Sequence, residues 1–238
     1  REYRQGWWNS AFKFQSFFLL GSRVCDVGSG AGWFLDFFSG FSKGTLETRG
    51  WGIEPSETAR RVARENLELK LFPDWKSLLT TLGEIGVRTV DSIRLSLVLE
   101  HVLDPKQFLL ENMVNLSPTG NLLIIVPNEM NPLQRQIKEH QDWWVSPVHI
   151  NYFTPESLRR LLHSVGLTVL WEGATFPMEL FHFLGIHYIG RERLGRVCHW
   201  LRLIIERIAG PQIFLTYQEI YKRWGCGREL IFLASRHD

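Results

Sequence analysis

Cysteine, net charge and long apolar runs are all scarce in this sequence, and each shortage excludes a class of protein. The three cysteines, Cys25, Cys198 and Cys226, stand far apart, so they indicate neither a disulfide framework nor a cysteine metal site. A net charge of +2 is too small by itself to argue for nucleic-acid binding. No apolar run reaches the roughly 18 residues of a membrane span, and none resembles a signal-peptide core. We therefore expect a cytoplasmic protein.

The composition is otherwise that of an ordinary globular protein. Of the 238 residues, 45% are hydrophobic and 22% are charged, and 10 Trp and 16 Phe supply large apolar contact surfaces. This length fits one α/β domain with an elaboration, and no internal repeat divides it. We expect a single domain over residues 1–238.

Short apolar runs alternate with segments of helical periodicity along most of the chain. This alternation predicts an α/β fold with a doubly wound, seven-stranded, mostly parallel sheet and helices on both faces. Residues 1–20 are expected to form a helical lead-in at the sheet edge, and residues 176–224 a helical insertion before the last strand. Thr154 is expected to cap a helix that begins at Pro155. The expected strands cover residues 23–27, 51–54, 69–72, 91–98, 121–126, 167–170 and 229–234.

The strongest chemical signal is Asp-Val-Gly-Ser-Gly-Ala-Gly at residues 26–32, directly after the first expected strand. Glycines at alternate positions permit a tight turn and the close approach of a ligand, and the next helix presents its N-terminus to an anionic group. The dinucleotide pattern Gly-x-Gly-x-x-Gly fits neither register, which argues against a nucleotide-dependent oxidoreductase. An aminoacyl ligand suits the loop better, with Asp26 beside its amine and backbone donors beside its carboxylate. A tight turn without a ligand is the alternative.

This loop resembles the first motif of class I (Rossmann-like) S-adenosylmethionine-dependent methyltransferases. The resemblance implies that the loop binds the methionine part of S-adenosylmethionine, and that S-adenosylhomocysteine is the product. On this basis Gly30→Val or Asp26→Ala should abolish cofactor binding and leave the fold intact. The residues implied in binding are Asp26, Gly28, Ser29, Gly30 and Gly32.

Glu54 provides a second element of the expected site. It ends the second expected strand, roughly twenty residues beyond the glycines, where a carboxylate can accept hydrogen bonds from both ribose hydroxyls. A solvated glutamate is the alternative. Glu54 and Pro55 together are similar to the second motif of the family. The acidic residue that meets adenine in that family normally follows the third strand, which points to Asp74, although a simple turn residue explains Asp74 equally well.

Two further segments resemble a narrower group. Leu-Glu-His-Val-Leu-Asp-Pro at residues 99–105 resembles a motif of the ubiquinone-biosynthesis O-methyltransferase-like subfamily, and His-Ile-Asn-Tyr-Phe-Thr at residues 149–154 resembles another of its segments. Residues 225–232 resemble the closing hairpin of the family, which implies an antiparallel last strand. In that family the carboxyl end of the fourth strand lies beside the transferred methyl group, which implies cofactor contacts for Leu97 and Glu100. Glu100 as a brace of the loop is the alternative.

His101 and His149 are the candidate catalytic residues. The sulfonium of the cofactor already activates its methyl group, so the enzyme mainly aligns the acceptor, and a hydroxyl acceptor also benefits from a base. Both histidines fall on loops expected at the carboxyl ends of strands, where such sheets bind ligands, and either could take the proton. Hydrogen-bonded structural histidines are the alternative. No metal ligand is identified, and the need for a metal is left open.

The acceptor is expected to be a small molecule or a glycan precursor, by analogy with relatives that share the C-terminal segment. Residues 191–208 combine an excess of arginine with an apolar stripe at helical spacing. A lid helix explains this pattern, and the alternative is a basic amphipathic surface that contacts anionic lipid or a phosphorylated substrate. A catalytically inactive cofactor-binding subunit is the alternative function. Nucleic-acid methylation is disfavoured, because an Asn-Pro-Pro-Tyr type of signature is absent.

Overall fold

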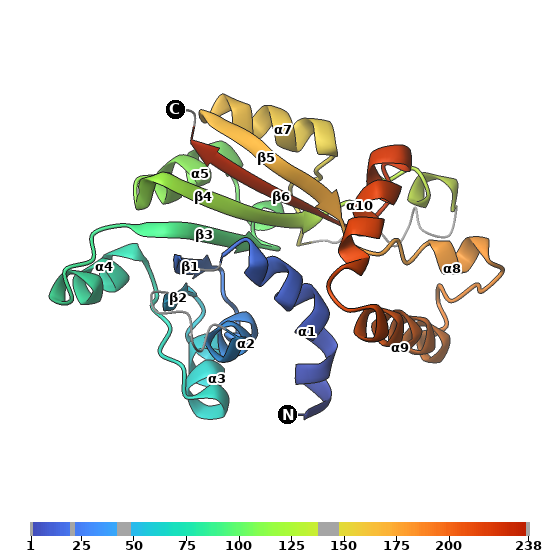
Figure 1. Ribbon diagram of the computed structural model, residues 1–238, viewed down its shortest axis with the longest axis horizontal. Coiled ribbons are helices and arrows are strands. Elements are labelled where there is room, and N and C mark those ends of the chain that lie inside the picture. Colours follow the sequence, from blue (N-terminus) through green and yellow to red (C-terminus); the bar gives the residue numbers. More distant parts are fainter. Residues whose placement is uncertain (1, 20–21, 42–48, 138–147, 237–238) are drawn as a thin grey trace.

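One sheet runs through the molecule, and the helices are arranged around it (Figure 1). The computed structural model describes residues 2–19, 22–41, 49–137 and 148–236, and for residues 2–9 and 41 it describes the backbone alone. Within these ranges six strands pair in the order β2-β1-β3-β4-β6-β5. They are β1 (Arg23–Val27), β2 (Arg49–Ile53), β3 (Val90–Ser96), β4 (Leu116–Pro127), β5 (Leu167–Ala174) and β6 (Glu229–Arg236).

Five of these strands run in one direction, and the last runs against them. Strands β2, β1, β3 and β4 pair in parallel, whereas β6 pairs antiparallel with both β4 and β5. The predicted α/β fold, with a mostly parallel sheet and an antiparallel last strand, is confirmed. Because parallel strands all end at the same edge of the sheet, their carboxyl-terminal loops meet there, and ligands bind at that edge in sheets of this kind.

The expected strand at residues 69–72 is replaced by a single bridge, so the described ranges contain six strands and not the predicted seven. Phe72 pairs with Ile53 at the end of β2. The N–H of Phe72 donates to the carbonyl oxygen of Gly52 at 2.9 Å. Pro73 follows at once and has no N–H to extend a ladder. The apolar run is therefore too short to continue the sheet beyond β2.

Helices cover both faces of the sheet, as predicted. Alternate residues of β4 point to opposite faces: Leu122 and Ile124 belong to one core, and Leu123 and Ile125 to the other. Helices α4, α5 and α7 contribute to the first core, and α1, α2, α3 and α10 to the second. The bounds are α1 (Glu2–Phe17), α2 (Trp33–Phe41), α3 (Glu57–Leu67), α4 (Trp75–Glu84), α5 (Pro105–Met113), α7 (Pro155–Ser164), α8 (Leu180–Phe183), α9 (Glu192–Ala209) and α10 (Ile213–Trp224), with short 3-10 turns η1 (Leu99–His101) and η2 (Gln134–Gln136).

The first helix lies over a face of the sheet, so the expected position at the sheet edge was wrong. Phe14 stacks on Phe214 of α10 with ring centroids 4.7 Å apart, and Phe12 meets Phe34 of α2 edge-to-face at 5.3 Å. Phe12 and Phe14 belong to the core that also contains Leu123 and Ile125 of β4, on one face of the sheet. This packing brings α1 close to the carboxyl ends of the strands.

Local signals set the beginnings of several helices. Thr154 caps α7, and its hydroxyl oxygen accepts a hydrogen bond from the N–H of Ser157 at 3.1 Å. Pro155 stands in the first turn, so the predicted start of this helix is confirmed. Ser56 caps α3 in the same manner. Among the described helices, none is both long enough and apolar enough to cross a membrane.

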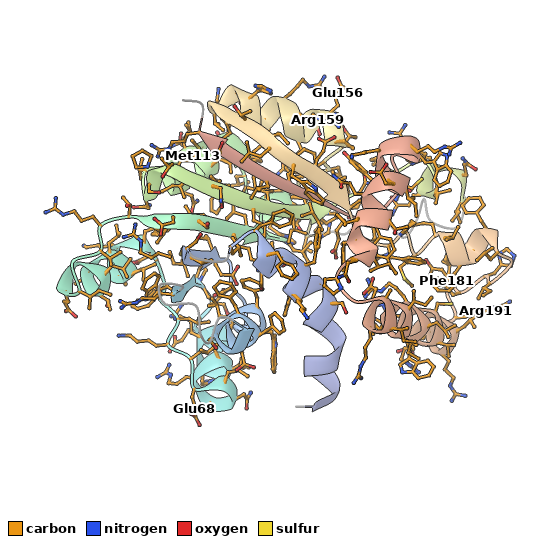
Figure 2. All side chains as sticks on the ribbon, viewed as in Figure 1. Glu68, Met113, Glu156, Arg159, Phe181 and Arg191 are labelled. Carbon is orange, nitrogen blue, oxygen red and sulfur yellow. The ribbon has the colours of Figure 1, made fainter. Side chains whose placement is uncertain are left out.

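Residues 176–224 form α8, α9 and α10. Helix α10 packs on β5, and α9 contacts α1. A small separate core of Met178, Phe181, Tyr188 and Cys198 joins α8 to α9, and Figure 2 shows Phe181 and Arg191 in this part of the molecule. In Figure 1, α8 and α9 lie on the side of the sheet toward which β4 and β5 point. This segment therefore stands near the edge where the strands end.

Candidate functional site

The loops after β1, β2 and β3 meet at one edge of the sheet. Val27 pairs with Ile53 of β2 and with Leu95 of β3, so the three strands end at nearly the same level. Beyond Val27 the N–H groups of Gly28 and Ser29 both donate to the carbonyl oxygen of Ile53, at 2.8 and 3.1 Å. The glycine loop is thereby fixed beside the residue that follows β2.

Two glycines of this loop have different physical reasons for being glycine. Gly28 has φ +75°, and a Cβ atom there would lie 2.5 Å from Cγ2 of Val98, so the loop after β3 leaves no room for a side chain. Gly30 has φ +55°, and no heavy atom lies within 4 Å of its Cβ position. Gly32 also has a positive φ, and α2 begins at the next residue. The loop thus presents open space and a helix N-terminus together, which suits a ligand with an anionic group.

Glu54 lies directly against the glycine loop. Its Oε2 atom accepts a hydrogen bond from the N–H of Gly30, and its Oε1 atom accepts one from the N–H of Ser56, both at 2.8 Å. Arg60 donates to the carbonyl oxygens of Glu54 and Pro55 and so holds this turn. The structure therefore brings together the two elements that the sequence placed about twenty residues apart.

Asp26 is buried in an ion pair that the sequence did not predict. Its Oδ1 atom accepts a hydrogen bond from Nη1 of Arg94 at 2.7 Å, and Arg94 also donates from Nε to Gln15 at 3.0 Å. Burial raises the pKa of the Asp26 carboxyl, while the guanidinium of Arg94 acts in the opposite direction. The Oδ2 atom is buried without a hydrogen-bond partner among the described residues. The available signal for Arg94 was an arginine between two apolar residues, Ile93 and Leu95, inside an expected strand.

Asp74 is an exposed helix cap. Its Oδ1 atom accepts a hydrogen bond from the N–H of Ser77 at 2.8 Å, and this bond holds the pKa of the carboxyl below its ordinary value. The next residue, Trp75, donates from its indole N–H to Oδ1 of Asn112 at 2.8 Å. Asp74 thus caps α4, and its predicted contact with adenine stays a prediction.

The backbone turns sharply where β3 ends. Leu97 has φ +57°, a left-handed conformation that is rare for a residue with a branched side chain. Its N–H still donates to the carbonyl oxygen of Ile125 at 2.9 Å. Strain of this kind persists where the surrounding structure enforces it, which is often at a functional site. It turns the chain into η1, which carries Glu100 and His101.

Glu100, His101 and His149 meet beyond this turn. The rings of His101 and His149 lie 4.8 Å apart between centroids. Nδ1 of His101 lies 2.9 Å from the carbonyl oxygen of Val148, and Nδ1 of His149 lies 2.7 Å from Oε1 of Glu129. Glu129 follows β4 and was not identified from the sequence, because nothing in its local pattern distinguishes it from a loop glutamate.

Glu100 both braces the loop and faces the histidines. Its carbonyl oxygen accepts hydrogen bonds from the N–H groups of Ile150 and Asn151, at 2.8 and 3.1 Å. Its carboxylate is 1% exposed, and Oε1 lies 3.9 Å from Nε2 of His101. Burial raises the pKa of this carboxyl. Glu100 thus braces the loop through its backbone, and its contact with the cofactor stays a prediction.

Two cavities open at this edge of the sheet. One has a volume of about 240 Å³ and is lined by Glu100, the two histidines and Glu129, among others. The second has a volume of about 260 Å³ and lies between α1, the end of β3 and α9. Leu97, Arg228 and Glu229 line both. The strained residue at the end of β3 therefore stands where the two cavities adjoin.

Comparison with solved structures identifies a shared fold. A SAM-dependent methyltransferase from Archaeoglobus fulgidus has a TM-score of 0.58 and 16% identity, covering 98% of this chain and 94% of that chain. The plantazolicin methyltransferase BpumL, in complex with a monoazolic desmethylPZN analog and SAH, has a TM-score of 0.54 and 16% identity, covering 99% of this chain and 83% of that chain. A SAM-dependent methyltransferase from Thermotoga maritima has a TM-score of 0.53 and 20% identity over 71% and 74%. At these identities the likeness shows the fold alone.

Sequence comparison identifies the family. No curated protein sequence matches the chain. The family model described as a methyltransferase domain matches residues 1–172, a range that includes the glycine loop, Glu54, the η1 turn and both histidines. The narrower ubiquinone-biosynthesis subfamily is not distinguished by this match. On its motifs, its fold and this match, the chain belongs to the methyltransferase-domain family.

Proposed function

We propose that this protein transfers a methyl group from S-adenosylmethionine to a hydroxyl group of a small molecule or a glycan precursor. S-adenosylmethionine is the cofactor and S-adenosylhomocysteine the product. The observation that carries the proposal is the hydrogen bond from the N–H of Gly30 to Glu54 at 2.8 Å. This hydrogen bond connects the glycine loop, which suits an aminoacyl group, to the carboxylate of Glu54, which suits a ribose.

The residues at this place fit the cofactor. The open space beside Gly30 and the helix N-terminus after Gly32 suit its carboxylate. The Oδ2 atom of Asp26, buried and without a hydrogen-bond partner among the described residues, suits its amine. Glu54 has lone pairs left for ribose hydroxyls beyond its two backbone hydrogen bonds. The proposed binding set is Asp26, Gly28, Ser29, Gly30, Gly32, Glu54, Pro55, Asp74, Leu97 and Glu100.

The acceptor side of the proposed site is the 240 Å³ cavity beyond Leu97. When bound, S-adenosylmethionine supplies a methyl group already activated by its sulfonium charge. The acceptor hydroxyl has to lose its proton as it is methylated. His101 and His149 line the cavity and are suited to act as the general base that accepts this proton. The carbonyl oxygen of Val148 can only accept a hydrogen bond, so Nδ1 of His101 carries the proton that is donated to it. In the neutral imidazole, Nε2 of His101 then carries the lone pair.

Calorimetric titration of the purified protein with S-adenosylmethionine, S-adenosylhomocysteine and NAD tests the cofactor. We expect both adenosyl compounds to bind and NAD not to bind. Glu54→Gln should weaken adenosyl binding by about 10- to 100-fold, because an amide is a poorer acceptor for two ribose hydroxyls. Glu57→Gln is the matched control, since Glu57 is an exposed residue in the first turn of α3. Binding of NAD, or equal affinity in the Glu54→Gln and Glu57→Gln proteins, contradicts the proposal.

A further inference from the structure

Four ionisable side chains from three separate segments of the chain converge on one cavity. Glu100 and His101 follow β3, Glu129 follows β4, and His149 precedes α7. One oxygen or nitrogen atom from each of Glu100, His101 and His149 lies within 4.8 Å of the other two. This is the spacing of atoms that can coordinate a single cation, and the residues are too far apart in the sequence to form a recognisable ligand motif.

The carboxylate of Glu100 lacks a hydrogen-bond partner among the described residues, although His101 lies 3.9 Å away. It is 1% exposed, and neither of its oxygen atoms has a hydrogen-bond partner among the residues that the structure describes. Burying such a group without a partner is costly, and native proteins seldom leave one unexplained. It faces the cavity that the histidines line. A cation at this position would satisfy it.

The histidines are oriented as metal ligands usually are. In protein metal sites, a ligating imidazole typically donates its other ring N–H to a carboxylate or a backbone carbonyl oxygen. Nδ1 of His149 lies 2.7 Å from Glu129, and Nδ1 of His101 lies 2.9 Å from the carbonyl oxygen of Val148. With both Nδ1 atoms held in this way, the Nε2 lone pairs are left to coordinate.

The charge of the cavity also favours a cation. Three carboxylates line it, those of Glu100, Glu129 and Glu229, against one guanidinium, that of Arg228. Carboxylates therefore outnumber guanidinium groups in the lining. Two imidazoles and one carboxylate suit a divalent transition-metal ion better than Mg²⁺ or Ca²⁺, which prefer oxygen ligands alone.

We infer that Glu100, His101 and His149 bind one divalent transition-metal ion, and that Glu129 positions His149. Three protein ligands leave coordination positions open, as in catalytic metal sites. The assignment of these positions to the acceptor hydroxyl rests on the proposed function. A coordinated hydroxyl loses its proton more readily than a free one, so the histidines would act on the acceptor through the metal.

Metal titration of untagged protein, first dialysed against a chelator, tests the site. Co²⁺ is followed by its visible absorption and Zn²⁺ by calorimetry. We expect one ion per chain in this site. Glu100→Gln and His149→Ala should each weaken binding by more than about tenfold, and Glu129→Gln by about 10- to 100-fold with a changed Co²⁺ spectrum. Thermal unfolding of each variant without metal shows whether it is folded.

The matched control is His187→Ala. His182 and His187 form a second histidine pair on the surface, with ring centroids 4.3 Å apart, and this exposed pair could bind Zn²⁺ weakly. His187→Ala should leave the tight site unchanged. Equal affinity in folded Glu100→Gln and unmodified protein overturns the inference, and so does loss of all binding in His187→Ala.

The same preparations separate this inference from the proposed function. Protein that binds S-adenosylmethionine but no metal would overturn the metal site and leave methyl transfer standing. Protein that binds metal at Glu100 but no adenosyl compound would overturn the function and leave the metal site standing.

Discussion

Arg94 of β3 holds Asp26 of β1 across the parallel ladder, with 2.7 Å between Nη1 and Oδ1 and both side chains almost fully buried. Arg94 also lies over the ring of Phe34, with 4.0 Å between its Cζ atom and the ring centroid. Asp26, the acidic residue of the loop motif, therefore takes part in a buried ion pair that contributes to the stability of the fold. A substitution there has to be judged by its effect on stability as well as on binding.

Asp26→Ala should unfold more readily than the unmodified protein, although the sequence alone predicted an intact fold. The substitution leaves Arg94 buried without its counter-charge, and losses of this kind cost about 3–5 kcal/mol. Urea unfolding measures the difference. Asp26→Ala combined with Arg94→Met should recover part of the loss, because the second change removes the uncompensated charge. A double variant less stable than Asp26→Ala would show that the pair is not the cause.

Gly28→Ala and Gly30→Ala should separate folding from binding. A methyl group at Gly28 meets Val98 at 2.5 Å, whereas the one at Gly30 meets no atom within 4 Å. Both positions have positive φ and share a strain cost of about 1–2 kcal/mol. We expect Gly28→Ala to be the less stable of the two by at least about 1 kcal/mol. Gly30→Ala should remain folded and lose affinity for S-adenosylmethionine by calorimetry. Normal affinity in Gly30→Ala would place the cofactor elsewhere.

Leu97→Gly should stabilise the protein or leave its stability unchanged. Glycine relieves a left-handed conformation that costs about 1–2 kcal/mol, and its own entropy cost offsets part of this gain. Leu97→Ala loses nearly the same apolar contact as Leu97→Gly but keeps the strain, so it should be the less stable of the two variants. Denaturant unfolding ranks the two. The opposite ranking would show that the left-handed conformation at residue 97 costs less than the backbone entropy that glycine loses on folding.

His199 should make stability depend on pH in the weakly acidic range. Burial, followed by the charges of Arg202 and Arg228, lowers the pKa of His199 to about 4 from an ordinary 6.5. The unfolded chain therefore binds this proton more readily than the folded protein does. The associated stability is present above about pH 6.5 and is lost as the pH falls toward 4.

The urea midpoint of the protein should accordingly fall between about pH 7 and pH 5. His199→Gln should show a smaller fall, since it removes the titrating group. Glu206 lies on the same helix, and burial raises its pKa, which acts in the opposite direction. The comparison between the two proteins isolates His199. Equal slopes for both would assign the pH dependence to other groups.

Local patterns predicted six of the seven expected strands correctly, and they predicted that Glu54 lies near the glycine loop. A strand followed by alternate glycines predicts a tight turn before a helix because only glycine adopts positive φ easily. Thr154 and Pro155 mark a helix start because each acts within one turn of the chain. The proximity of Glu54 to the glycine loop followed from the fixed geometry of a strand, helix and strand unit.

The tertiary structure decided the contacts that depend on strand register and on loops far apart in the sequence. The pairing of Asp26 with Arg94 requires β1 and β3 to be neighbours in one register. The meeting of Glu100 with His149 requires two loops on either side of β4 to fold back to the same edge. The sequence by itself determined which residues could carry methyl-transfer chemistry, because motifs are local. Only the packed sheet decided which of them face one another, because such contacts join residues far apart along the chain.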